Sequence, residues 1–255
     1  ETFGQIMKSS LAPYRDELFI STKAGHDMWP GPYGNWGSRK HLMASLEQSL
    51  KRMNLEYVDV FYSHRYDPET PLEETLQTLV DIVHQGKALY VGLSKYPLEA
   101  YLFASRFLKE RDVPCLLYQG RYSMLVREPE SQGILQAVRE NGAGFVAFSP
   151  LAQGLLTNRY LHGIPEDSRI ARGGFLKKEA LTPEVLRKIQ ALNEHARLRG
   201  QSLAEMALAW LLKDASITSV LVGASSVEQL GDSLKALDNL SFEEEELQRI
   251  EEILA

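Results

Sequence analysis

The sequence contains a single cysteine, Cys115, among its 255 residues. An intramolecular disulfide is therefore excluded, and such sparse use of cysteine is typical of a reducing compartment. Cys115 stands in the apolar run 115–118, where a small buried hydrophobe is a better interpretation than a nucleophile. We therefore expect a cytoplasmic protein.

Long apolar runs and an excess of basic residues are also missing. No stretch approaches the roughly 20 apolar residues of a membrane-spanning helix, so no membrane partner is expected. The net charge of −6 argues against non-specific binding to nucleic acid or to anionic membranes. A phosphate site would therefore have to be a local pocket. We predict no metal site.

What the sequence does contain is an alternation of short apolar segments with helical patterns. Several helices begin with clear signals: Ser38 as N-cap, Thr70-Pro71, Thr182-Pro183, the capping box Ser202 to Glu205, and Ser226. Further helices are expected over 98–109, 131–140 and 242–254. The six expected strands are 18–22, 57–62, 89–93, 115–119, 145–148 and 219–222. Short apolar strands separated by helices predict a parallel sheet within an α/β fold.

No linker rich in proline, serine or glycine interrupts this alternation, so we predict one domain over 1–255. The chain is long for an ordinary domain but within the usual size of a single α/β barrel. It also begins in what reads as the middle of a helix, at residues 2–7. The natural N-terminus is therefore expected to lie upstream of Glu1.

Polar residues follow the ends of four expected strands: Lys23, His64, Ser94 and Gln119. In α/β barrels this edge of the sheet carries the catalytic residues. Lys23 is either a salt-bridged rim residue or a desolvated catalytic amine, whereas His64 alone is slightly better interpreted as a structural histidine. Ser94 and Gln119 are not informative by themselves.

The last expected strand leads directly into a helix through the segment 222–226, Val-Gly-Ala-Ser-Ser. A helix start with a glycine and serine hydroxyls aims backbone N–H groups at the space beyond the strand. Such an arrangement can hold an anionic group without a basic side chain. The segment predicts a phosphate site.

Together these motifs resemble the aldo-keto reductases over essentially the whole chain. The similarity is closest to the branch that holds bacterial L-glyceraldehyde 3-phosphate reductases and potassium-channel beta subunits. The segments that carry the resemblance are 21–25, 57–64, 92–94, Gln119, 148–157, 222–225 with Gln229, and the loop 27–34.

The resemblance implies a (β/α)8 TIM barrel whose first two strand–helix units are absent from this chain, since six units are counted rather than eight. It implies Lys23 and His64 as catalytic residues and NADPH as cofactor. Trp29 and Tyr33 are the candidate residues near the substrate. The residues implied for the cofactor are Ser94, Gln119, Phe148, Ser149, Leu151, Gly154, Thr157, Arg159, Arg169, Ser225, Gln229, Asp232 and Ser233.

Within this set, Ser94 and Gln119 would bind the nicotinamide carboxamide, Phe148 would stack on its ring, and Arg169 would meet the 2′-phosphate. Simpler readings stay open: Gln229 could close a capping box, and Arg159 and Arg169 could belong to a solvated basic loop. Lys95 departs from the Asn that many relatives carry, and Asp232 and Ser233 replace a Glu-Asn pair.

In the family the proton donor is a tyrosine, assisted by a lysine that pairs with an aspartate. This tyrosine and aspartate are expected upstream of residue 1, since Tyr14, Tyr33, Tyr62 and Asp16 stand in the wrong places. The leading hypothesis is NADPH-dependent reduction of small aldehydes or ketones, with L-glyceraldehyde 3-phosphate and methylglyoxal as candidate substrates. The alternative is a nucleotide-binding regulatory subunit. A homo-oligomer is compatible with either.

Overall fold

The computed structural model describes residues 1–166, 168, 170–171, 173 and 176–255. The six strands follow one another in the sheet in chain order, and the pairings of β1 with β2, β2 with β3, and β3 with β4 are parallel. The strands are β1 (Ser21–Ala24), β2 (Val58–Ser63), β3 (Ala88–Ser94), β4 (Cys115–Arg121), β5 (Gly144–Phe148) and β6 (Ile217–Leu221). The predicted parallel α/β sheet is confirmed, with most strand boundaries shifted by one to three residues.

The chain forms two compact units. Unit 1 comprises residues 1–120 and 132–145, and unit 2 comprises residues 121–131 and 146–255. The prediction of one domain over 1–255 stays a prediction.

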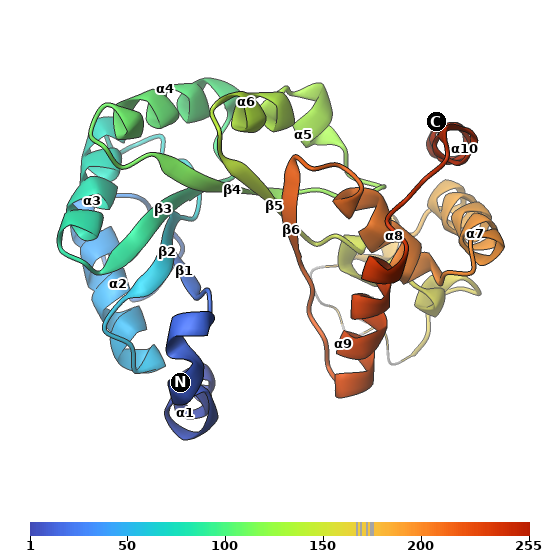
Figure 1. Cartoon of the computed structure of the whole chain (residues 1–255), viewed down its shortest axis with the longest axis horizontal. Coiled ribbons are helices and arrows are strands. Elements are labelled where there is room, and N and C mark those ends of the chain that lie inside the picture. The colour runs from blue at the N-terminus through green and yellow to red at the C-terminus, as the bar shows by residue number, and fades with distance from the viewer. Residues whose placement is uncertain (167, 169, 172, 174–175) are drawn as a thin grey trace. The chain divides into compact units, whose positions relative to one another are not determined.

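In unit 1, helices cover one face of strands β1 to β4 (Figure 1). Its helical elements are α1 (Thr2–Ile6), η1 (Met7–Leu11), η2 (Ala12–Glu17), α2 (Arg39–Met53), α3 (Leu72–His84), α4 (Leu98–Lys109) and α6 (Ile134–Glu140). Strand β2 is buried along its whole length, as expected for a strand covered on both faces. Leu42, Leu46 and Leu50 of α2 recur at helical spacing and are buried.

The helix starts of unit 1 follow the sequence signals in part. Ser38 is the N-cap of α2, and its hydroxyl accepts the His41 N–H, as predicted. Thr70 is not the cap of α3: Pro71 is the N-cap, without a side-chain hydrogen bond. The Thr70 N–H instead donates to the carboxylate of Asp67, which precedes the helix, so Asp67 stabilises the turn that leads into α3. The cap prediction at Thr70 was therefore wrong.

The helix predicted over 131–140 is divided. Residues Glu128–Ser131 form α5, and Ile134–Glu140 form α6. Gly133 between them has φ of +74°, a left-handed conformation that interrupts helical hydrogen bonding. A glycine at this point was the available signal for the break.

Unit 2 is built around α8, which packs against β6, α9 and α7. The helical elements of unit 2 are α5, η3 (Ala152–Gly154), η4 (Asn158–Tyr160), η5 (Lys178–Ala180), α7 (Pro183–Leu198), α8 (Leu203–Leu212), α9 (Val227–Leu234), η6 (Lys235–Asp238) and α10 (Glu244–Leu254). The predicted caps at Thr182 and Ser226 and the capping box from Ser202 to Glu205 are confirmed. The long irregular stretch before α7 contains only short 3-10 turns among its described residues.

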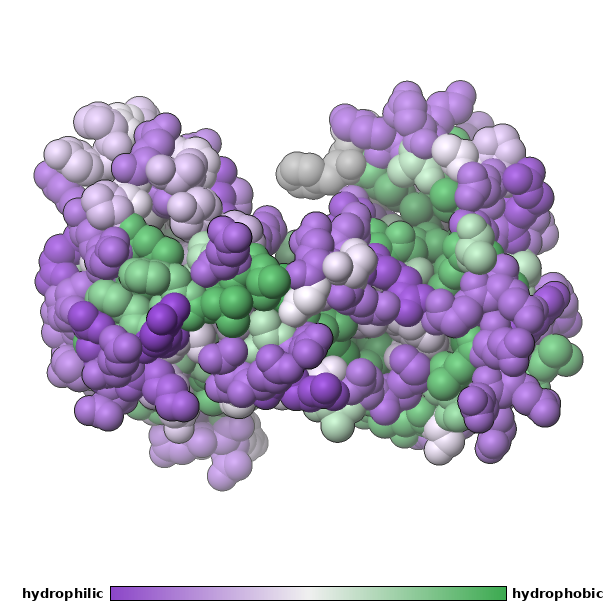
Figure 2. Space-filling model, turned by 90° about the horizontal axis from the view of Figure 1, so that it is seen from above, coloured by the Kyte–Doolittle hydropathy of each residue, from purple (hydrophilic) through white to green (hydrophobic). Residues whose placement is uncertain are grey.

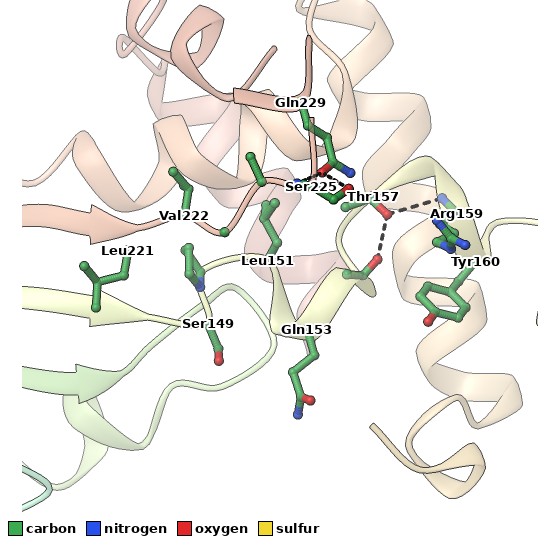
Figure 3. Close-up of a pocket in the computed structure, with 14 residues that line it drawn as sticks. Ser149, Leu151, Gln153, Thr157, Arg159, Tyr160, Leu221, Val222, Ser225 and Gln229 are labelled. Atoms are coloured by element: carbon green, nitrogen blue, oxygen red, sulfur yellow. Dashed lines mark hydrogen bonds between the residues drawn. The ribbon is translucent and has the colours of Figure 1, made fainter. Parts of the chain in front are cut away.

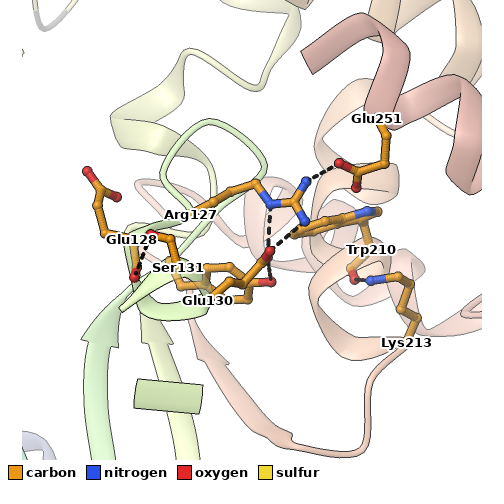
Figure 4. A network of polar contacts seen from close by, with 8 residues as sticks. Arg127, Glu128, Glu130, Ser131, Trp210, Lys213 and Glu251 are labelled. Carbon is orange, nitrogen blue, oxygen red and sulfur yellow. Dashed lines mark hydrogen bonds and ion pairs between the residues drawn. The ribbon is translucent and has the colours of Figure 1, made fainter. Parts of the chain in front are cut away.

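Arg127 connects α5 to α10 within unit 2 (Figure 4). Its guanidinium donates to both carboxylate oxygens of Glu130, at 2.9 and 2.6 Å, and to Glu251 at 2.5 Å. It also lies 5.0 Å from the ring of the buried Trp210. A forked guanidinium suits this arrangement because it can serve two carboxylates at once.

Hydrophilic residues cover most of the face shown in Figure 2, with hydrophobic residues in separate patches. No described helix combines the length and the apolar character needed to cross a membrane. Within the described ranges, no group of three or more His, Cys, Asp or Glu side chains is placed to hold a metal ion.

Candidate active site

Four of the predicted site residues meet at one edge of the sheet in unit 1. Lys23 of β1 is in register with Tyr62 of β2, and Ser94 of β3 is in register with Gln119 of β4. His64 follows the last residue of β2, and its N–H donates to the Ala24 carbonyl at 2.9 Å. The carboxyl ends of parallel strands lie at the same edge, so strand order alone brings these side chains together.

Lys23 and Gln119 are in direct contact. The Lys23 Nζ donates to the Gln119 Oε1 at 2.6 Å, and the Gln119 amide donates in turn to the Tyr62 hydroxyl. Burial lowers the pKa of Lys23, and the charge of Lys95 lowers it further. Of the two readings of Lys23, the desolvated amine fits this environment, because no described carboxylate forms an ion pair with it.

Ser94 is buried, and its Oγ has no hydrogen-bond partner among the described residues. An unsatisfied buried hydroxyl costs about 1–3 kcal/mol, so it is usually matched by a ligand or water. A carboxamide group would supply such a partner. The residues at this edge therefore fit the group that the resemblance implied for them.

His64 is poised to stay neutral. Burial is the largest cause that lowers the pKa of its imidazole, to about 4, and the charges of His26, Lys23, Lys95 and Arg65 act in the same direction. A neutral imidazole can donate one N–H and accept at its other nitrogen. His64 can thus hydrogen-bond a carbonyl oxygen at neutral pH without carrying a charge.

The loop between β1 and α2 lies beside this edge in unit 1. Trp29 lines a shallow cavity of about 460 Å³ formed by residues of 27–35, whereas Tyr33 does not line it. Tyr33 is half exposed, with Lys40 4.5 Å above its ring. Arg65 holds the loop by donating to the Gly25 carbonyl and to Asn35, and its guanidinium stacks on Trp36. The predicted roles of Trp29 and Tyr33 stay predictions.

A second and larger cavity, of about 730 Å³, lies in unit 2 (Figure 3). It is lined by the segment after β5 and by the segment that connects β6 to α9. Seven predicted cofactor residues are among its lining: Ser149, Leu151, Gly154, Thr157, Arg159, Ser225 and Gln229. The sequence therefore identified most of the polar lining of this cavity.

The first of these segments has an unusual backbone. Ser149, Ala152 and Gln153 have φ between +47° and +60°, and Gly154 has φ of +105°. Left-handed conformations cost a non-glycine residue about 1–3 kcal/mol and gather at ligand-binding sites. Mixed right- and left-handed residues also turn backbone N–H groups inward, which forms anion-binding concavities. In this segment the Ala152 and Gly154 N–H groups donate to the Ser149 and Leu151 carbonyls, at 2.9 and 2.8 Å, so the turn is held by its own backbone.

The second segment is fixed by Gln229, whose side chain reaches back to Ser225 (Figure 3). Its Oε1 accepts the Ser225 N–H at 2.7 Å and the Ser225 hydroxyl at 2.9 Å. A capping box would require the N–H of the N-cap, Ser226, so Gln229 does not close one. It orders the turn in front of the helix instead.

The remaining predicted cofactor residues are placed differently. Phe148, Asp232 and Ser233 do not line the cavity of unit 2. Asp232 pairs with Lys235 at 2.7 Å, and the Ser233 hydroxyl donates to the Gln229 carbonyl. Arg169 lies outside the described residues. The cofactor roles of these four residues, like those of the residues that line the cavity, stay predictions.

Sequence reasoning missed two neighbours of His64, the imidazole of His26 and the guanidinium of Arg65. The ring of His26 lies 4.4 Å from that of His64, edge to face, and Arg65 contributes to the low pKa of the same imidazole. Both follow a strand end by two residues, which was the available signal. Lys95 was noted only as a departure; its φ of +55° is the left-handed conformation that Asn tolerates better.

Comparison with known proteins agrees with this arrangement. The sequence model of the aldo/keto reductase family matches residues 1–255. L-glyceraldehyde 3-phosphate reductase of Escherichia coli O157:H7 is 55% identical over 260 residues, which cover 100% of this chain and 75% of that protein. The protein of the same name from strain K12 is 54% identical over the same shares. A probable voltage-gated potassium channel subunit beta of Arabidopsis thaliana is 35% identical over 93% of this chain and 73% of that protein. The chain therefore belongs to the aldo/keto reductase family of oxidoreductases.

Proposed function

We propose that the protein reduces small aldehydes or ketones with NADPH, and that L-glyceraldehyde 3-phosphate is among its substrates. The observation that carries the proposal is the neutral His64 beside the desolvated Lys23 at the carboxyl ends of β1 and β2. The relatives at 55% and 54% identity, which are named for this substrate, support it.

Bound NADPH would supply the hydride for the carbonyl carbon. In the proposed site, His64 donates a hydrogen bond to the carbonyl oxygen and so orients the substrate. Burial lowers the pKa of Lys23. In its charged form, the Lys23 ammonium would stabilise the deprotonated form of a neighbouring donor and so favour release of its proton. Burial raises the pKa of Tyr62, so its hydroxyl keeps its proton at neutral pH.

Residues of unit 1 would bind the nicotinamide carboxamide of the cofactor, and residues of unit 2 would bind its phosphates. In unit 1, the Ser94 hydroxyl, which has no partner among the described residues, would bond a carboxamide beside the polar side chain of Gln119. In unit 2, the cavity lined by the segment 149–154, by Arg159 and by the turn at Ser225 would take the phosphate groups. We assign the choice of NADPH over NADH to Arg169, whose guanidinium would pair with a 2′-phosphate.

The test is NADPH consumption, followed by absorbance, with the protein as expressed from its own gene. Turnover is expected with methylglyoxal and with L-glyceraldehyde 3-phosphate. His64→Ala and Lys23→Met should each lower kcat by about 100-fold or more, as is usual for loss of acid–base assistance. Lys51→Met, at an exposed lysine in the last turn of α2, is the matched control and should behave as wild type.

Tight NADPH binding without turnover of either carbonyl would contradict this proposal. It would favour the second candidate, a nucleotide-binding regulatory subunit, for which the potassium channel subunit beta of Arabidopsis thaliana is the relevant relative. Equal activities in wild type and the two variants would reject the assigned roles of His64 and Lys23.

A further inference from the structure

The segment 25–36, which follows β1, is attached to the end of β2 by the side chain of Arg65. The Arg65 Nε donates to the Gly25 carbonyl at 2.8 Å, and its Nη2 donates to the Asn35 Oδ1 at 2.7 Å. The guanidinium carbon lies 3.7 Å from the centre of the Trp36 ring. One half-buried side chain therefore holds this segment near both of its ends.

The far end of the segment has a backbone that needs such support. Trp36 has φ of +69°, a conformation that a bulky side chain rarely adopts. The Trp36 N–H donates, at 2.8 Å, to the same Asn35 Oδ1 that accepts from the Arg65 guanidinium. The Asn35 oxygen and the stacked guanidinium thus fix Trp36 together. Residues in such sparsely populated conformations persist where their surroundings determine them, and they gather at functional sites.

The near end of the segment lies directly against His64. Gly25 has φ of +140°, and a Cβ added to it would lie 3.2 Å from the His64 Cβ, closer than an ordinary contact. His26 comes next, and its ring meets the His64 ring edge to face at 4.4 Å. The His64 imidazole is therefore bordered by residues whose backbone Arg65 holds at the Gly25 carbonyl. In a close-packed arrangement, a shift of this backbone would be transmitted to the imidazole.

We propose that Arg65 is a positioning residue, which fixes the His64 imidazole for the substrate carbonyl by holding the segment 25–36. This inference rests on the proposed reductase function and adds a residue that acts through His64. An arginine suits this role because its planar fork can bond two oxygens while its face stacks on an aromatic ring. A lysine ammonium is a point charge and cannot make these contacts together. Arg65→Lys therefore keeps the charge and removes the connection.

The kinetic test measures kcat and KM for methylglyoxal at saturating NADPH, with the protein as expressed from its own gene. Arg65→Lys should lower kcat by about ten-fold, because a displaced His64 would bond the carbonyl oxygen less well in the transition state. KM should change by less than about three-fold, as expected when an interaction specific to the transition state is lost. Arg106→Lys, at an exposed arginine of α4, is the matched control and should behave as wild type.

Asn35→Ala tests the same connection from its other side and leaves the guanidinium in place. It removes the oxygen that Arg65 and the Trp36 N–H share, and it should lower kcat by about three-fold. In the double variant, kcat should equal that of Arg65→Lys within about two-fold, because both changes break one connection. Full multiplication of the two effects would instead show that Asn35 and Arg65 act separately, which contradicts the proposal.

Amide hydrogen exchange and NMR of the histidine rings do not depend on turnover. In Arg65→Lys, the Met28 and Gly34 amides, which donate to carbonyls within the segment, should exchange faster than in wild type. The amides of α4 should exchange as before. The imidazole resonances of His64 should shift, whereas those of the exposed His84, at the end of α3, should not.

The outcomes separate this inference from the proposed function. If wild type shows no turnover while Arg65→Lys loosens the segment and shifts the His64 resonances, the reductase function is rejected and the link from Arg65 to His64 is retained. Wild-type kcat in Arg65→Lys, or a loss of kcat without any change at His64, overturns the inference. Faster exchange throughout unit 1 also overturns it, because Arg65 would then support the whole fold.

Discussion

Replacing Gln229 tests the turn that precedes α9 in unit 2. Gln229→Ala removes two hydrogen bonds, those from the Ser225 N–H and the Ser225 hydroxyl. Each intramolecular hydrogen bond contributes about 0.5–1.5 kcal/mol net, and both groups are exposed, so their combined effect is expected near the lower limit, about 1 kcal/mol. If this ordering is needed for NADPH binding, the Kd should rise about five-fold.

Two further variants separate order from charge. Gln229→Glu retains an acceptor for Ser225 but adds a negative charge to the lining of the cavity. Its Kd for NADPH should therefore rise most at low salt and approach the wild-type value as salt screens the repulsion. Gln136→Ala, at an exposed glutamine of α6 that bonds Glu140, is the control for loss of a surface glutamine.

The assay is fluorescence or calorimetric titration of the full protein with NADPH at two salt concentrations. A Kd for Gln229→Ala equal to that of wild type would refute the reasoning, since the turn would then not need Gln229. A salt-independent effect of Gln229→Glu would refute the placement of a phosphate near this residue. Thermal unfolding of each variant verifies that the native fold is retained.

Three other perturbations have outcomes set by the described contacts. Gly92→Ala should destabilise the protein by about 1–3 kcal/mol in urea unfolding, because its Cβ would lie 2.3 Å from Tyr62 Cε1; Gly231→Ala, in open space on α9, should not. The pKa of His64 is about 4 in the folded protein, against the ordinary value of 6.5 that applies to the unfolded chain. The folded state therefore gains its full advantage above pH 6.5, where His64 is neutral in both states. This contribution, about 1 kcal/mol after screening, is lost as the pH falls toward 4. His64→Gln should flatten the pH dependence of unfolding in that window, and an unchanged slope would contradict the shift. Arg127→Lys should cost about 1 kcal/mol in urea unfolding, since an ammonium cannot reproduce the forked contacts with Glu130; an unchanged midpoint would show that the fork is dispensable.

Local chemistry explains why so much of the fold was predictable. Strand and helix types followed from apolar periodicity, and the caps at Ser38, Thr182, Ser202 and Ser226 need only the residue and its own helix. The failure at Thr70 has a neighbouring cause: Asp67, three residues upstream, accepts the Thr70 N–H and side chain, and helix-start rules do not include that partner. The break at Gly133 depended on whether one glycine would turn left-handed.

The sequence by itself also determined that Lys23, His64, Ser94 and Gln119 share one edge of the sheet, because parallel strands place their carboxyl ends together. It could not determine their electrostatics. The low pKa of His64 depends on burial and on charges from three strand ends. Whether Gln229 closes a capping box or binds the Ser225 N–H likewise depends on where its side chain lies in the folded protein. Desolvation and through-space charge act over a few ångströms between residues far apart in the chain, so only the tertiary structure decided them.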